Sequence, residues 1–193
     1  MILNKSDNNS IEICSKILLN NGVVIIPTDT VYGFSTVVTS SYAQAKINSK
    51  KITQLKGRDE NKPFIQLIGN KEDLFNYTFD KIPDFLLSYW PGPLTIIVNN
   101  KDKTSTTAFR CPSDKWLLSL LNEVKLPIYS TSVNYSGLPI LEKISDIKKE
   151  FSNKVDLIIE GGDRINCSSS TIVKIENDEI KVLRQGELVI KEL

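Results

Sequence analysis

The sequence contains no histidine, and this absence excludes several kinds of chemistry. A Ser-His-Asp triad, a histidine general base and histidine metal ligands all require an imidazole. The cysteines Cys14, Cys111 and Cys167 are few, widely spaced and without a Cys-x-x-Cys pair. The sequence therefore supports neither a disulfide framework nor a zinc site, and we expect the cysteines to be buried or half-buried.

Long apolar runs and an excess of either charge are also missing. No stretch approaches the roughly 18 apolar residues of a membrane span, and the N-terminus lacks the apolar core of a signal peptide. We therefore expect a cytoplasmic protein with no membrane partner. With 24 basic and 23 acidic residues the net charge is +1, so the chain is not a general binder of polyanions. Any anion site must be local.

Two common phosphate-binding loops are absent as well. No Gly-x-Gly-x-x-Gly follows the first predicted strand, and no Gly-x-x-x-x-Gly-Lys-Ser/Thr occurs anywhere. A bound nucleotide would have to be held by side-chain cations and hydroxyls. At 193 residues and 40% hydrophobic content the chain suits one substantial core, and it shows no repeat or linker. We expect a single domain over residues 1–193.

Apolar periodicity and turn residues predict alternating helices and strands. The first helix is expected to begin at a Ser10 cap and end at Gly22, and Ser113 is the expected cap of another. Further helices are predicted at 41–53, 71–77, 83–90, 116–124 and 144–151. Strands are predicted at 23–27, 34–38, 64–68, 94–98, 128–131, 155–159, 171–175 and 180–183, with a polar loop at 101–107. This order indicates an α/β fold with a mixed sheet.

Two short segments carry the most informative chemistry. Residues 27–33 read Pro-Thr-Asp-Thr-Val-Tyr-Gly and follow a buried apolar run, so their hydroxyls lie at the end of a rigid strand. Residues 56–63 read Lys-Gly-Arg-Asp-Glu-Asn-Lys-Pro and hold three cations. Each alone could be an ordinary turn or a solvated basic loop. Together they suit an acceptor and a polyphosphate in one cleft.

Five later segments complete the pattern. They are Trp90-Pro-Gly-Pro-Leu-Thr, Arg110-Cys-Pro, Ser130-Thr-Ser-Val-Asn-Tyr-Ser-Gly, Ser170-Thr-Ile-Val and Arg184-Gln-Gly. In this order, the seven segments resemble the YrdC-type threonylcarbamoyl-AMP synthase family over nearly the whole chain. The resemblance implies a single YrdC-like domain, with a twisted mixed β-sheet, flanking helices and a concave basic cleft.

The resemblance also implies an activity. Enzymes of this family are L-threonylcarbamoyladenylate synthases, nucleotidyltransferases that join L-threonine, bicarbonate and ATP into threonylcarbamoyl-AMP and pyrophosphate. The product serves N6-threonylcarbamoyladenosine formation at adenosine 37 of tRNA, so Mg²⁺ with ATP and a downstream threonylcarbamoyl-transferase complex are expected. Such a reaction mainly needs two anions to be neutralised and aligned, which a chain without histidine can do.

Site residues follow from matching positions in the family. The catalytic assignments are Lys56 and Arg58. The ATP-binding assignments are Arg58, Lys62, Thr106, Ser132, Asn134, the backbone near Ile140, and Arg184. The threonine-binding assignments are Thr30, Tyr32, Arg110, Ser130 and Ser170. Arg110 suits the substrate carboxylate because its guanidinium is a planar, bidentate fork.

Some positions stay open. Strand-end hydroxyls such as Thr30 commonly satisfy only local backbone groups. Asn134 either positions the Ser132 loop or touches a phosphate, and the metal ligands are unassigned. We expect Trp90 to anchor its turn, and Gly33 and Gly137 to permit close backbone approach or positive φ.

The chain departs from the pattern at a few places. Leu67 stands where longer relatives often carry a histidine, and Asp59 replaces a residue that is often Pro or Ser. The chain ends soon after Arg184-Gln-Gly, so we expect a short form without the additional C-terminal domain of the longer relatives.

Two alternatives remain. A non-catalytic binder of double-stranded RNA or tRNA would use a cationic cluster of Lys46, Lys50, Lys51, Lys56, Arg58 and Lys62 on phosphates. The near-zero net charge and the lack of a stacking aromatic array argue against it. A related carbamoyl-adenylate chemistry occurs in hydrogenase-maturation enzymes, but those chains are much longer and carry zinc-finger and acylphosphatase-like segments.

Overall fold

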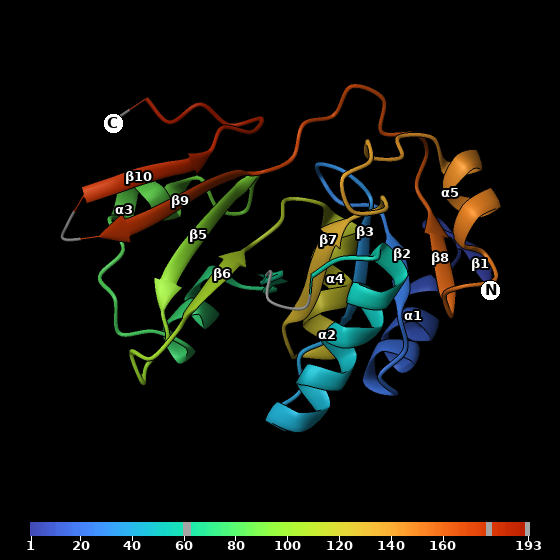
Figure 1. Ribbon diagram of the computed structural model, residues 1–193, viewed down its shortest axis with the longest axis horizontal. Coiled ribbons are helices and arrows are strands. Elements are labelled where there is room, and N and C mark those ends of the chain that lie inside the picture. Colours follow the sequence, from blue (N-terminus) through green and yellow to red (C-terminus); the bar gives the residue numbers. More distant parts are fainter. Residues whose placement is uncertain (60–62, 177–178, 192–193) are drawn as a thin grey trace.

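The computed structural model describes residues 1–59, 63–176 and 179–191, and its centre is one mixed β-sheet (Figure 1). The ten strands lie in the order β1-β8-β2-β3-β7-β4-β6-β5-β9-β10. Their bounds are β1 Ile2–Asn4, β2 Val24–Ile26, β3 Gly33–Val37, β4 Ile65–Leu67, β5 Leu94–Asn99, β6 Thr106–Arg110, β7 Ile128–Ser132, β8 Leu157–Glu160, β9 Thr171–Glu176 and β10 Glu179–Arg184. Helices flank the sheet: α1 Ser10–Leu19, α2 Tyr42–Lys56, α3 Asp84–Ser88, α4 Lys115–Val124, α5 Ile144–Phe151 and a 3₁₀ helix η1 Lys71–Asn76.

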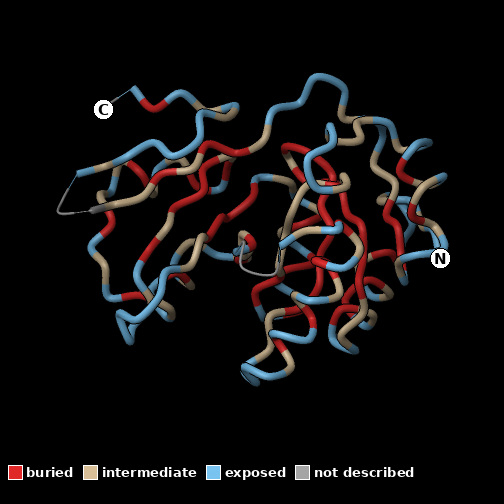
Figure 2. The backbone as a smooth tube through the Cα atoms, in the orientation of Figure 1, coloured by how far each residue is buried: buried red, intermediate tan, exposed pale blue. Residues whose placement is uncertain are grey.

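Strand pairing confirms the predicted mixed α/β fold. Parallel pairs join β1 to β8, β2 to β8, β4 to β6 and β5 to β9. Antiparallel pairs join β2 to β3, β3 to β7, β4 to β7, β5 to β6 and β9 to β10. The β9–β10 pair is the hairpin that the sequence predicts. Figure 2 shows that the buried backbone is concentrated in the central strands.

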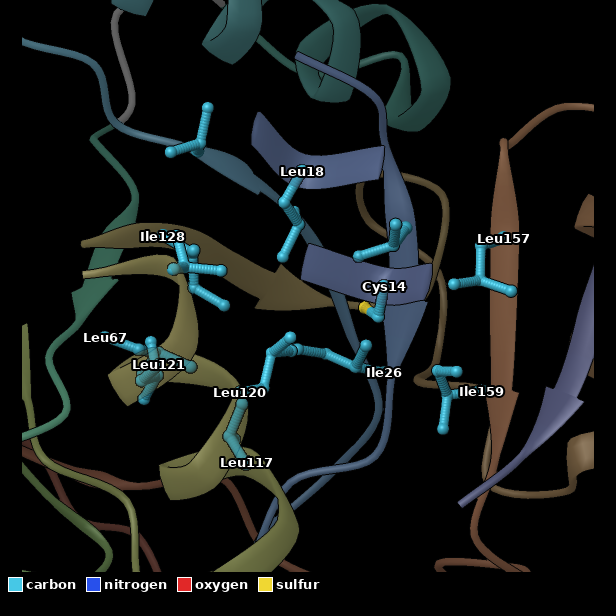
Figure 3. Close-up of a cluster of buried hydrophobic side chains, with 13 residues drawn as sticks. Cys14, Leu18, Ile26, Leu67, Leu117, Leu120, Leu121, Ile128, Leu157 and Ile159 are labelled. Atoms are coloured by element: carbon cyan, nitrogen blue, oxygen red, sulfur yellow. The ribbon is translucent and has the colours of Figure 1, made fainter. Parts of the chain in front are cut away.

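One face of the sheet is covered by α1 and α4. Cys14 and Leu18 of α1 pack with Leu117, Leu120 and Leu121 of α4 against strands β2, β4, β7 and β8 (Figure 3). The α4 apolar residues recur at helical spacing, which places them on one stripe toward the sheet. Leu67 belongs to this cluster and is 1% exposed, so its side chain fills the core.

The opposite face is covered by α2 and α5. Ile52 of α2 and Phe151 of α5 pack on Ile25 and Phe34. The Phe34 and Phe151 rings meet edge to face with centroids 4.9 Å apart, a favoured aromatic geometry.

The remaining strands have a core of their own under η1 and α3. Leu74, Leu86 and Trp90 pack there against Leu94 and Phe109. The Trp90 indole is buried and donates to the Leu94 carbonyl at 2.6 Å, so Trp90 anchors its turn as expected.

The predicted helix caps are only partly right. Ser41 is the N-cap of α2, as predicted, and accepts from the Gln44 amide. Ser10 is not a cap, because it is the first helical residue and its hydroxyl donates to the Lys5 carbonyl. Nor does Gly22 end α1, which stops at Leu19 with the positive φ at Asn21.

The cap of α4 was also predicted at the wrong residue. Asp114, and not Ser113, accepts from the Leu117 amide at 2.9 Å. The adjacent residues offer two side-chain oxygens, and the sequence does not distinguish which of them turns toward the helix.

Two strands were not predicted. β1 has only three residues and pairs at the sheet edge with β8. β6 begins inside the predicted polar loop, because Thr106 and Thr107 belong to it, and it lies between β4 and β5. Neighbouring strands stabilise both, which a local pattern does not reveal.

The described helices include none long and apolar enough to cross a membrane. Cys14 and Cys111 are buried as expected, and burial raises their thiol pKa values to about 12 and about 11. The expectation is wrong for Cys167, which is exposed in the segment before β9.

Candidate active site

A cleft of about 210 Å³ lies where residues from both halves of the sheet meet. Its lining is rich in hydroxyls, which come from the turn after β2 (Thr28, Thr30), the end of β7 (Ser130, Thr131, Ser132) and the segment before β9 (Ser169, Ser170). Arg58, Arg110 and Arg184 add the charge, and no lysine or carboxylate is among the described lining residues. The chain has four arginines, so three of them lie in one cleft.

Arg110 is fixed from three sides. It ends β6, is 4% exposed, and its Nε donates to the Gly92 carbonyl at 3.1 Å. Nη1 donates to Thr30 Oγ1 at 2.9 Å, and Nη2 pairs with Asp29 Oδ1 at 2.5 Å. The guanidinium is therefore held rigidly at the cleft wall.

Arg184 and Ser170 form a second fixed contact. Arg184, at the end of β10, donates from Nε to the Ser170 carbonyl at 2.9 Å and from Nη2 to Ser170 Oγ at 3.0 Å. Ser170 Oγ also lies 2.8 Å from Thr95 Oγ1, so its hydroxyl is buried and engaged. Burial, and then the charge of Arg110, lower the pKa of Arg184, which reflects two like charges at one site.

Arg58 lies on the other side of the cleft. It follows α2, and its Nη1 donates to Thr131 Oγ1 at 3.2 Å while Nη2 donates to the Pro63 carbonyl at 3.2 Å. The guanidinium carbon stands 5.0 Å from the Phe64 ring centroid, in cation–π range. Its Nε is buried without a partner, and burial lowers the pKa of the side chain. A half-buried cation with an unused donor suits an incoming anion.

Lys56 is not among the residues that line the cleft. It ends α2, is 3% exposed, and its ammonium donates to the Ser132 carbonyl, to the Asn134 carbonyl at 3.0 Å and to Asn134 Oδ1 at 2.8 Å. All three ammonium hydrogens are thus engaged. Ser132 Oγ donates to the same Asn134 oxygen at 2.7 Å. In this arrangement Lys56 and Asn134 shape the Ser132 loop, the first of the two alternatives left open for Asn134.

Tyr32 and Gly33 explain the local shape of the cleft wall. The Tyr32 hydroxyl donates to the Gly162 carbonyl at 2.8 Å and accepts from the Gly161 amide at 2.9 Å. Tyr32 thus lines the cleft while its hydroxyl ties down the 160–162 segment. A Cβ at Gly33 would lie 2.8 Å from Ser130 Oγ, so a larger residue there would displace that hydroxyl, and Gly137 has φ +81° as expected.

The cleft contains most, but not all, of the assigned residues. Thr30, Tyr32, Arg58, Arg110, Ser130, Ser132, Ser170 and Arg184 line it. Thr106 lines a neighbouring hollow of about 200 Å³ that shares Pro63 and Phe64 with the cleft. Lys56, Asn134 and Ile140 are absent from the described lining, and Lys62 lies outside the described residues.

Sequence reasoning missed other members of the site. Thr28, Thr131 and Ser169 line the cleft, and each is next to or near a predicted residue in the same motif. Thr28 Oγ1 donates to the Val31 carbonyl at 2.7 Å and lies 3.0 Å from Thr30 Oγ1, so it shapes the turn that presents Thr30. The sequence signal that could have found them was a hydroxyl side chain one or two positions from an assigned residue.

The described residues contain no group of three or more His, Cys, Asp or Glu side chains that could hold a metal ion. Asp29 is not among the lining residues, and its carboxylate is already paired with Arg110. Hard cations prefer oxygen ligands, mainly carboxylates and phosphates. Among the described residues, the cleft lining offers hydroxyl and carbonyl oxygens and no carboxylate cluster for a metal ion.

Comparison with known proteins places this geometry in a family. The Sua5/YciO/YrdC family model, described as telomere recombination, matches residues 16–186. A Methanocaldococcus jannaschii protein, provisionally named threonylcarbamoyl-AMP synthase, is 30% identical over 99% of this chain and 93% of its own length. Bacillus subtilis threonylcarbamoyl-AMP synthase is 30% identical over 92% of this chain and 53% of its own length.

A solved structure agrees with these matches. The crystal structure of P. abyssi Sua5 complexed with L-threonine has a TM-score of 0.85 and 27% identity, and the match covers 97% of this chain and 58% of that one. The chain thus spans nearly all of the M. jannaschii protein but little more than half of the B. subtilis and P. abyssi proteins. These matches confirm the family resemblance inferred from the motifs. The chain belongs to the Sua5/YciO/YrdC family.

Proposed function

We propose that this chain is an L-threonylcarbamoyladenylate synthase, a nucleotidyltransferase that makes threonylcarbamoyl-AMP and pyrophosphate from L-threonine, bicarbonate and ATP. The observation that carries the proposal is the cleft itself, in which three arginines are fixed by hydroxyls and carbonyls. Guanidinium groups bind carboxylates and phosphates through paired hydrogen bonds, and both reactants are anions.

The size of the cleft separates the two substrates. About 210 Å³ is below the roughly 300–1,000 Å³ of sites that enclose drug-sized ligands, so it suits an amino acid and not a whole nucleotide. We assign L-threonine to the enclosed part, with Arg110 at its carboxylate and with Thr30, Ser130, Ser170 and Tyr32 around it. We assign ATP to the mouth near Arg58, Arg184 and Ser132. The outer assignments are Thr106, Asn134, Ile140 and Lys62, of which Lys62 lies outside the described residues.

The reaction follows from this placement. The threonine amine and bicarbonate condense to a carbamate with loss of water, and a carbamate oxygen then attacks the α-phosphorus of ATP while pyrophosphate leaves. Arginine charge stabilises the oxygens that gain charge, and fixed geometry aligns the two reactants. Mg²⁺ enters with ATP and neutralises part of its triphosphate. Without a histidine or a lining carboxylate, bicarbonate or water accepts the amine proton.

The first experiment measures pyrophosphate release by the purified chain with MgATP, bicarbonate and L-threonine, each omitted in turn. We expect release that needs all three, and Arg58→Ala or Arg110→Ala should lower kcat/KM by about 10²-fold or more, because each removes a charged donor from the cleft wall. Glu150→Gln is the matched control, since Glu150 lies on α5, pairs with Lys154 beyond the end of that helix and is not among the cleft residues.

The same experiment tests the alternative. The named relatives favour synthase over a non-catalytic RNA binder. If ATP stays intact under every combination while double-stranded RNA or tRNA binds with a steep salt dependence, the RNA-binding function replaces the one proposed here. We assign the product to a downstream threonylcarbamoyl-transferase complex that modifies tRNA.

A further inference from the structure

Asp29 lies beside the cleft and links two of its walls. It belongs to the turn after β2, and its Oδ1 pairs with Arg110 Nη2 at 2.5 Å. Its Oδ2 accepts from both the amide of Ser113, at 3.0 Å, and the Ser113 hydroxyl, at 2.9 Å. The side chains of Arg110 and Asp29 are only 5% and 11% exposed. The pair therefore joins the turn that carries Thr30 to the segment that follows β6.

The hydrogen-bond inventory of Arg110 shows what this pair leaves free. A guanidinium has five N–H groups. Gly92, Thr30 and Asp29 take one each, from Nε, Nη1 and Nη2 respectively. One N–H therefore remains on each terminal nitrogen, at a residue that lines the cleft. Two N–H groups on neighbouring nitrogens match the two oxygens of a carboxylate.

The negative charge of Asp29 stabilises its pair with Arg110. Burial alone would raise the pKa of Asp29, but the Arg110 charge and the Ser113 hydrogen bonds outweigh it and hold the pKa below its usual range. The carboxylate is thus ionised at neutral pH. An ionised partner at 2.5 Å fixes an arginine side chain far more firmly than a neutral one would.

We propose that Asp29 is a positioning residue of the amino-acid subsite, which holds the Arg110 guanidinium against Thr30 so that its two remaining N–H groups meet the substrate carboxylate. Ser113 acts through Asp29 by fixing its second oxygen. This proposal rests on the proposed function, because L-threonine is the ligand whose carboxylate Arg110 binds. ATP binding at Arg58 does not depend on Asp29.

The test compares Asp29→Asn, Asp29→Glu and Ser113→Ala with the wild type. Asp29→Asn keeps the shape of the side chain but removes its charge. KM for L-threonine should therefore rise about 10- to 100-fold, as expected for a lost charged hydrogen bond. KM for ATP should stay within about twofold, and Ser113→Ala should raise KM for L-threonine only about two- to fivefold. Asp29→Glu keeps the charge and should recover part of the loss. Asp80→Asn is the matched control, because that carboxylate accepts from the Asn99 amide and is not among the cleft residues.

Calorimetric titration with L-threonine separates this proposal from the synthase activity. If the wild type releases no pyrophosphate but binds L-threonine, and Asp29→Asn weakens that binding, the synthase function fails and the positioning role stands. If pyrophosphate is released and Asp29→Asn leaves KM for L-threonine unchanged, the positioning role is overturned and the synthase function stands. Absence of both release and binding overturns both. If Asp29→Asn does not fold, Ser113→Ala provides the test, because Ser113 is exposed and its substitution should not prevent folding. An unchanged KM for L-threonine in Ser113→Ala would then overturn the proposal.

Discussion

The choice of arginine at single positions defines the chemistry of the cleft. The chain holds four arginines among its 24 basic residues, yet every described basic residue that lines the cleft is an arginine. A lysine ammonium is a point donor, whereas a guanidinium bridges two fixed acceptors and still presents further N–H groups. Arg58 uses this property, because it bonds Thr131 and Pro63 while it lies over Phe64.

Arg58→Lys should therefore behave as a severe substitution at the nucleotide. A lysine keeps the charge but does not bridge the Thr131 hydroxyl and the Pro63 carbonyl, so we expect KM for ATP to rise about tenfold or more. KM for L-threonine, measured at saturating ATP, serves as the internal control and should change less than about twofold. An equal rise in both KM values would contradict a separate nucleotide position for Arg58.

The lowered pKa of Lys56 predicts that raising the pH above about 8 lowers activity but raises the unfolding free energy. Burial, and then the charge of Arg58, lower the pKa of Lys56 from 10.5 to about 8. Above that pH the neutral amine has two N–H groups for three acceptors, so the Ser132 loop loses a contact and activity should fall with an apparent pKa of about 8. Because the unfolded chain binds the proton more tightly, the Lys56 contribution to the unfolding free energy should rise between pH 8 and 10.5.

Pyrophosphate release and urea unfolding, each followed across pH 7 to 10 in the same buffers, check this prediction. Lys56→Gln does not titrate, so it should lack the alkaline fall in whatever activity it retains. An unchanged alkaline limb in Lys56→Gln would assign that limb to another group.

At residue scale, the motifs located the arginines of the cleft better than the residues that hold them in place. Arg58, Arg110 and Arg184 could be assigned from sequence because each stands in a recognisable segment. The contact of Asp29 with Ser113 spans 84 positions and that with Arg110 spans 81, so no local pattern reveals it. The ammonium of Lys56 likewise meets acceptors 76 and 78 positions away, which is why its place outside the lining could not be foreseen.

At the scale of single elements, the residue that caps a helix contributes to its stability, and the N-cap of α4 allows this contribution to be measured. Asp114 accepts from the Leu117 amide and also pairs with Lys5 near the end of β1. Asp114→Ala should lower the unfolding free energy by about 1–2 kcal/mol, the usual range for a lost N-cap. Ser113→Ala should cost under about 0.5 kcal/mol, because its exposed hydroxyl does not cap the helix. Urea unfolding of both variants measures the difference, and a larger cost at Ser113 would return the cap to that residue.

The elements that sequence predicted well carry their signal locally. The α2 cap at Ser41 and the β9–β10 hairpin both follow from short patterns, and both are confirmed. β6 was missed because five residues, Thr106 to Arg110, follow a polar turn and gain their order from β4 and β5 on either side. That strand matters for function, since its last residue is Arg110. One of the two strands that the sequence did not predict therefore carries an arginine of the cleft.

At the scale of the whole molecule, the cleft is assembled only by folding. Its three arginines follow α2, end β6 and end β10, and they belong to strands and helices on both halves of the sheet. The buried residues of the α1–α4 cluster and of the cluster under η1 and α3 do not line the cleft, whereas Tyr32 and Phe64 of the α2–α5 cluster do. Packing in the first two clusters and ligand binding should consequently contribute to stability as independent terms, since distant sites are usually additive.

Thermal unfolding tests this separation. A ligand at about 100 times its Kd stabilises the folded state by about 2.7 kcal/mol, which should raise Tm by about 5–10 °C in a chain of this size. Leu120→Ala, at a fully buried position in the α1–α4 core, should cost about 2–5 kcal/mol and lower Tm without ligand. The rise in Tm caused by L-threonine should nevertheless match that of the wild type.

Arg110→Ala should show the reverse, with no rise in Tm on adding L-threonine but a retained rise on adding MgATP. If Leu120→Ala abolished the response to L-threonine, the core and the cleft would be coupled, and the separation argued here would be wrong.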